Sequence, residues 1–191
     1  MSEGPHRLDE WLFDSGIRQI HEAYRESEAV FITKQKSLLD WLTELQRRKE
    51  PVPAVMAALD PETTAQYQIE QTEETIQVIR QTFLVALYHH WERSMLRWQG
   101  STNGRFKESP ATWLAANSLP YDAEGMEDYR LLMKVIKHET GGDALITRRP
   151  DLFPNGSHKL DDLHLSTAAV KRFFETIRGS GHQWKLQYVS W

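Results

Sequence analysis

Cysteine is absent from this 191-residue chain. Its absence excludes disulfide bonds, thiolate nucleophiles and cysteine-ligated zinc. Long apolar runs are also missing, because the longest extends only from Phe83 to Tyr88, far short of a membrane span. The N-terminal sequence MSEGPHRLDEW contains no apolar signal region, so we expect a cytoplasmic protein that does not enter a membrane.

Short motifs that mark common enzyme classes are absent as well. The chain contains no phosphate-binding glycine loop, no nucleophile elbow and no Rossmann fingerprint, and we expect no cofactor. In HKLDDLH, His158 and His164 bracket two aspartates. Histidine and aspartate can both bind a metal, but the spacing of these four residues matches no established site. We therefore expect no metal, and a metal-dependent hydrolase is the weakest of the functional hypotheses.

Positive charge is scarce overall but unevenly distributed. The net charge is −4, which argues against a generally basic nucleic-acid-binding protein. Residues 130–191 nevertheless contain 10 Lys and Arg against 6 Asp and Glu, whereas the remainder contains 13 against 21. A basic C-terminal third could bind a phosphate-rich ligand or an acidic partner, and an ordinary solvated surface is the alternative.

Apolar residues recur at helical spacing through most of the chain, which predicts an all-α protein. We expect a long helical segment over residues 10–49, as one helix or two, and a break at the prolines of residues 50–53. Asp60 and Pro61 then predict the start of a long central helix that ends near Trp98. The predicted organisation is a helical segment over residues 1–50 and a bundle over residues 60–191, forming one compact unit overall.

The stretch from Gly125 to Phe153 carries the most information. We expect a helix from about Met126 to His138, ended by Gly141 and Gly142, and then a short helix that Asp143 caps. The exposed side of the first helix is basic and ends in an imidazole. It contains Arg130, Lys134, Lys137 and His138.

This stretch resembles the terminal motif helix of HEPN-type helical proteins of bacteria. The resemblance rests on Lys137, His138 and Gly142, and on the run from Arg149 to Phe153; the apolar run that ends at Glu92 also resembles the family's central helix. It implies a HEPN-like helical bundle, a homodimer, and a role in a toxin or phage-defence system that acts on or binds RNA. If active, such a protein is a metal-independent ribonuclease.

The resemblance implies His138 as the general acid or base, with Arg130 and Lys134 completing the catalytic group. Lys137, Arg148 and Arg149 are then the expected phosphate or RNA contacts. The family places its arginine four to six residues before the histidine, whereas seven residues separate Arg130 from His138 here. In one helix these two side chains lie ~12 Å apart along the axis, too far to share one phosphate within a single chain.

Two alternatives for this basic face remain open. The first is an ordinary exposed surface in which Glu127 pairs with Arg130 or His138 caps the helix end. The second is a non-catalytic module that binds a partner nuclease or another defence protein, using exposed tryptophans such as Trp184 and Trp191.

Two histidines of the central helix are predicted to differ. His90 falls among apolar residues, so we expect it to be a core histidine bonded to a backbone carbonyl. His89, Glu92 and Arg93 lie on the remaining side of the helix, and we expect His89 at the surface.

Overall fold

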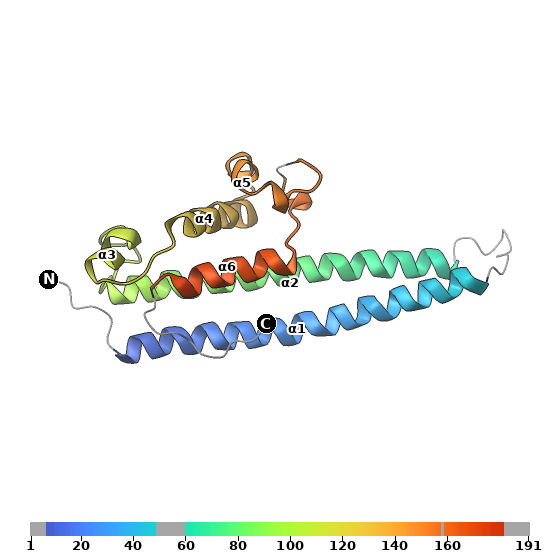
Figure 1. Ribbon diagram of the computed structural model, residues 1–191, viewed down its shortest axis with the longest axis horizontal. Helices are drawn as coiled ribbons and strands as arrows, with labels where there is room; N and C mark the ends of the chain where they lie inside the picture. Colours follow the sequence, from blue (N-terminus) through green and yellow to red (C-terminus); the bar gives the residue numbers. More distant parts are fainter. Residues whose placement is uncertain (1–6, 49–59, 158, 182–191) are drawn as a thin grey trace. The chain divides into compact units, whose positions relative to one another are not determined.

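The computed structural model describes residues 7–48, 60–157 and 159–181, and in these ranges the chain is all-α with no strand (Figure 1). The predicted fold class is therefore confirmed, whereas the HEPN-like details stay a prediction. Six α-helices and two short 3-10 helices occur in the order α1 (Arg7–Arg48), α2 (Pro61–Trp98), α3 (Pro110–Ala116), α4 (Ala123–His138), α5 (Gly142–Arg148), η2 (Pro150–Leu152), η3 (Leu160–Asp162) and α6 (Thr167–Gly179).

Helices α2, α3 and α6 each begin directly after a residue whose side chain caps the first turn. The carboxylate of Asp60 accepts the backbone N–H of Glu62 at 3.3 Å, and α2 starts at Pro61. Ser109 and Ser166 accept backbone N–H groups at the starts of α3 and α6, respectively. Between η2 and α6 the chain forms the helical turn η3. None of the described helices is both long and apolar enough to cross a membrane.

The chain divides into two compact units. One comprises Met1–Glu22 and Gln81–Trp191, and the other comprises Ala23–Arg80. The division falls within α1 and α2, so each long helix contributes to both units. The break predicted between residues 50 and 60 lies almost entirely outside the described residues, and the predicted segment and bundle stay a prediction.

The unit Ala23–Arg80 consists of segments of α1 and α2 that lie side by side (Figure 1). Arg80 donates to Glu28 at 2.7 Å, and both side chains are about nine-tenths buried. Burial raises the pKa of neighbouring Tyr24, and the Glu28 carboxylate raises it further. A buried ion pair between two helices favours one register, because either charge alone would be costly to bury.

The larger unit has an aromatic core around α2, α4 and α6. Tyr129 of α4 is fully buried, and its hydroxyl donates to the carbonyl of Leu84 at 2.8 Å. The centre of its ring also lies 4.9 Å from that of Phe173 on α6. The indole of Trp91 donates to the carbonyl of Ser180 at 3.0 Å, which fixes the end of α6 against α2. The basic side of α4 therefore faces away from this core.

The structural role predicted for His90 is confirmed. Its Nε2 atom lies 2.9 Å from the carbonyl oxygen of Phe13, and the two rings stack with centroids 5.5 Å apart. Burial lowers the pKa of His90 below the usual histidine value. A Cβ atom at Gly16 would lie only 2.1 Å from the His90 ring, so this close packing needs glycine.

Candidate functional site

Helix α4 presents its basic residues to solvent because its other side fills the core. Its N-cap is Asp122, whose carboxylate accepts the N–H of Gly125 at 2.9 Å. Tyr129, Leu132 and Met133 are at most 4% exposed. The side chains on the opposite side are exposed, and they are Arg130, Lys134, Lys137 and His138. One helix thus brings together four of the six site residues predicted from the sequence, as an open surface.

Arg130 is paired within its own helix. Its Nε and Nη2 atoms donate to the two carboxylate oxygens of Glu127 at 2.7 and 2.6 Å. The paired carboxylate raises the pKa of Arg130, and the guanidinium lowers the pKa of Glu127. The ion pair proposed as an alternative for this face is therefore present. Because both side chains are more than two-fifths exposed, the pair contributes little to stability and can exchange for another anion.

Lys137 contacts a histidine of α2. Its Nζ atom lies 3.1 Å from Nε2 of His89, and Nδ1 of His89 lies 3.2 Å from a carboxylate oxygen of Glu92. The Lys137 side chain and both α2 side chains are accessible to solvent. An ammonium can only donate, so it requires an unprotonated Nε2, and Nδ1–H then donates to Glu92. These two contacts orient the His89 ring.

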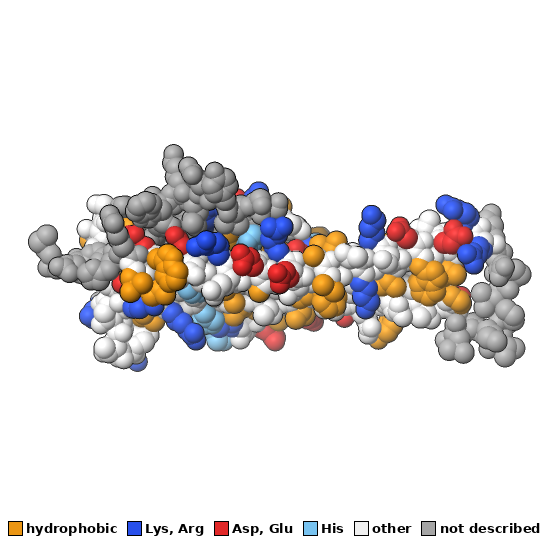
Figure 2. All heavy atoms as spheres, turned by 90° about the horizontal axis from the view of Figure 1, so that it is seen from below, with side chains coloured by type: hydrophobic (Ala, Val, Ile, Leu, Met, Phe, Trp, Pro, Cys, Tyr) orange, Lys and Arg blue, Asp and Glu red, His pale blue; other side chains and the backbone are white. Residues whose placement is uncertain are grey.

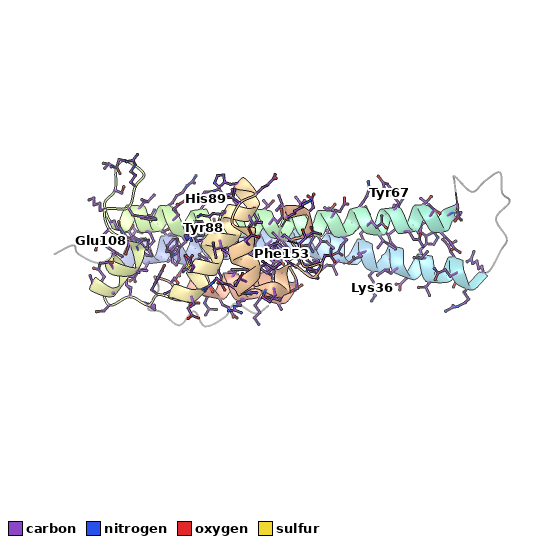
Figure 3. The ribbon with its side chains drawn as sticks, turned by 90° about the horizontal axis from the view of Figure 1, so that it is seen from above. Lys36, Tyr67, Tyr88, His89, Glu108 and Phe153 are labelled. Carbon is purple, nitrogen blue, oxygen red and sulfur yellow. The ribbon has the colours of Figure 1, made fainter. Side chains whose placement is uncertain are left out.

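Tyr88 of α2 lies within the electrostatic influence of charged groups on both α2 and α4. Burial raises the pKa of Tyr88 to about 12, and the charge of Glu92 adds to this, whereas the charge of Arg130 opposes it. The centre of its ring lies 5.4 Å from that of Tyr129. Tyr88 and His89 are adjacent on α2 (Figure 3). The surface formed by His89, Glu92, Arg130, Lys134 and Lys137 is called the α2–α4 face below.

His138 lies at the open end of α4. It is the last residue of the helix, and the C-cap is Glu139, in the left-handed region at φ 53°. The imidazole is exposed and forms no hydrogen bond or ion pair with another described residue. The structure thus leaves its predicted catalytic role untested. No buried carboxylate among the described residues contacts His138 to orient its ring.

Arg148 and Arg149 differ in accessibility although they are adjacent. Arg148 is two-fifths exposed and donates to the buried carboxylate of Asp128. Arg149 is 5% exposed, and it donates twice to Asp151 at 2.8 Å. Its guanidinium also lies 5.2 Å from the centre of the Phe173 ring. These contacts give Arg149 a structural role, and we leave it out of the candidate site.

The turn between α4 and α5 departs from the predicted cap. Gly141 is the N-cap of α5, with φ 83°, and Asp143 lies in the first turn instead of capping it. Gly141 packs against Lys134, since a Cβ at this position would lie 3.5 Å from the Lys134 Cβ. The left-handed backbone is therefore the reason for glycine at this position, since a Cβ atom would meet only ordinary contacts.

The described residues contain no group of three or more His, Asp or Glu side chains arranged to hold a metal ion. The backbone N–H of His164 donates to the carbonyl of Leu152 at 2.8 Å, which ties this loop to η2. His158, the other histidine of the hypothetical metal site, lies outside the described residues. Trp184 and Trp191 also lie outside them.

Sequence analysis alone did not identify His89 and Glu92 as members of a site. The available signal was their spacing, since a histidine and a glutamate three residues apart share one side of a helix. That pair would have been ordinary without Lys137, which is 48 positions further along the chain.

No family model matches this chain, and neither does any curated protein or solved structure.

Proposed function

We propose that the protein binds RNA through the α2–α4 face, as a HEPN-like protein of a bacterial toxin or defence system. The observation that carries the proposal is the line of exposed cations on α4, at the spacing i, i+4 and i+7, beside an oriented histidine on α2. Arg130, Lys134 and Lys137 span about 10 Å along the helix, a length suited to successive phosphates of a single strand.

The proposed affinity arises from the phosphate backbone and not from base recognition. Glu127 and Glu92 reduce the positive charge of this face, so binding should be modest and sensitive to salt. Arg130 contributes when phosphate replaces Glu127 as its partner. A planar guanidinium suits both anions, because each can accept two parallel hydrogen bonds.

The proposal is tested with an RNA strand that cannot be cleaved, methylated at each 2′-oxygen. Fluorescence anisotropy over a salt series should give a steep loss of affinity for the wild type. Lys134→Ala and Lys137→Ala should each reduce the slope of log K against log salt by about 0.7. Lys36→Ala is the matched control, because Lys36 is an exposed lysine of the other unit (Figure 3). An equal effect of all three substitutions would contradict a specific face.

Catalysis belongs to the same proposal as its active form, a metal-independent ribonuclease. The resemblance implies His138 as the general acid or base, with Lys134 one turn before it on α4 and Arg130 about 12 Å away along the helix axis. RNA cleavage in EDTA by the wild type and by His138→Ala tests this assignment. Activity retained by His138→Ala would remove His138 from the mechanism without affecting the proposal that the face binds RNA.

A second candidate is a non-catalytic module that binds a protein partner. The observation in its favour is the exposure of large apolar side chains on both long helices, including Trp11 at 58%, Val30 at 63% and Tyr67 at 59%. In Figure 2 exposed apolar side chains form separate groups among charged ones. Under this candidate Trp11→Ala weakens partner binding, whereas Lys134→Ala leaves it unchanged.

A further inference from the structure

The contacts of His89 are those of a general base. One ring nitrogen, Nδ1, lies 3.2 Å from the Glu92 carboxylate, and the other, Nε2, faces the Lys137 ammonium at 3.1 Å. Histidine is the side chain that most readily exchanges protons near neutral pH, and a carboxylate behind it stabilises the imidazolium that forms. His138 has none of these neighbours among the described residues.

Access to solvent is the second requirement, and His89 meets it. The side chains of His89 and Glu92 are 37% and 36% exposed, and Lys137 is exposed on α4. A strand of RNA on the α2–α4 face would therefore reach Nε2 once the Lys137 ammonium turns toward a phosphate. A purely structural histidine in this protein looks different, because His90 is bonded to a backbone carbonyl and stacked on Phe13.

We infer that His89 is the catalytic base of RNA cleavage on the α2–α4 face, oriented by Glu92 and assisted by Lys137. The inference rests on the proposed function, since it requires RNA to bind this face. A phosphate attracts the Lys137 ammonium, which leaves Nε2 of His89 available. Nε2 then accepts the proton of a ribose 2′-hydroxyl, and the 2′-oxygen attacks the adjacent phosphorus.

The protons balance with these residues alone. As the 2′-oxygen–phosphorus bond forms, the bond from phosphorus to the 5′-oxygen breaks, and that oxygen takes a proton from the Lys137 ammonium. The His89 imidazolium then returns its proton to the neutral amine across their contact, because an amine is the stronger base. The products are a 2′,3′-cyclic phosphate and a 5′-hydroxyl, and the step consumes no water.

The test compares cleavage of single-stranded RNA in EDTA by the wild type, His89→Gln, Glu92→Gln, Lys137→Met and His138→Ala. We expect His89→Gln to reduce the rate about 100-fold or more and Glu92→Gln about 10-fold or more, with products that carry cyclic phosphate ends. His138→Ala tests the base that the resemblance implies, and activity lost in that variant but kept in His89→Gln would overturn the inference. Arg93→Ala is the matched control, because it removes an exposed cation of α2 outside the contacts of His89.

Binding of the 2′-methylated strand, measured with each variant, separates the two proposals. Wild-type binding without cleavage would overturn the catalytic inference and leave the RNA-binding proposal standing. Cleavage that survives His89→Gln would overturn it as well. No binding at low salt would overturn both. Unchanged circular dichroism and melting temperature of His89→Gln would show that the reduced activity does not reflect unfolding.

Discussion

Replacing Arg149 with alanine should lower the free energy of unfolding, and it should have no specific effect on RNA binding. The side chain is 5% exposed, donates twice to Asp151, and lies over the ring of Phe173. The sequence resemblance by itself places this arginine among the phosphate contacts. The burial of its guanidinium supplies the physical reason to expect a structural effect.

The magnitude follows from the interactions that the substitution removes. Hydrogen bonds to a charged group contribute about 1.5–3 kcal/mol, and the interaction of the cation with Phe173 about 0.5–2 kcal/mol. Two features place the summed loss of free energy at the lower end of these ranges. Asp151 is 58% exposed and can be hydrated again, and Nη1 of Arg149 forms no hydrogen bond with a described residue. We expect the free energy of unfolding to fall by about 2–3 kcal/mol.

Urea denaturation followed by circular dichroism measures this change, with Arg105→Ala as the control, because Arg105 is an exposed arginine of the same unit. Its removal should leave the free energy of unfolding nearly unchanged. A stability of Arg149→Ala within about 0.5 kcal/mol of the wild type, the range of ordinary surface substitutions, together with weaker RNA binding, would refute the reasoning. That result would mean that the guanidinium is available to a ligand despite its burial.

Three further predictions concern pH, the buried ion pair and self-association. Burial lowers the pKa of His90 in the folded state, so the neutral ring stabilises the protein fully above about pH 6.5. This stabilisation is lost as the pH falls through the folded-state pKa. His90→Gln should therefore flatten the acid side of a plot of unfolding free energy against pH. Glu28→Ala should lower the unfolding free energy by about 3–5 kcal/mol in chemical denaturation, because the Arg80 charge stays buried, and replacing both residues by leucine and methionine should recover most of the loss. A double variant as unstable as Glu28→Ala would show that the pair itself stabilises the unit. The protein should elute as a homodimer in size-exclusion chromatography with light scattering, and a monomer at all concentrations would contradict that expectation.

The sequence was sufficient to predict the local structure, because short-range rules decide it. Asp60 with Pro61, Ser109 and Ser166 mark helix starts through hydrogen bonds that span two or three residues. The apolar arc of α4 indicated which side would be buried. His90 was identified as a core histidine because its position along α2 places it among apolar neighbours. The turn after α4 was harder to predict, since a glutamate adopts its left-handed C-cap.

Tertiary structure decided which polar residues meet, and periodicity within one helix cannot provide that information. His89 and Lys137 are 48 positions apart, and their contact depends on how α2 and α4 pack. Arg148 and Arg149 looked equivalent in the sequence, yet the path of the chain after α5 buries only one guanidinium. The sequence by itself determined the helices, several of their caps and their buried sides, because those depend on neighbours within a turn or two. Only the packing of helices decided which exposed charges stand beside a histidine, because that depends on contacts between residues distant in the chain.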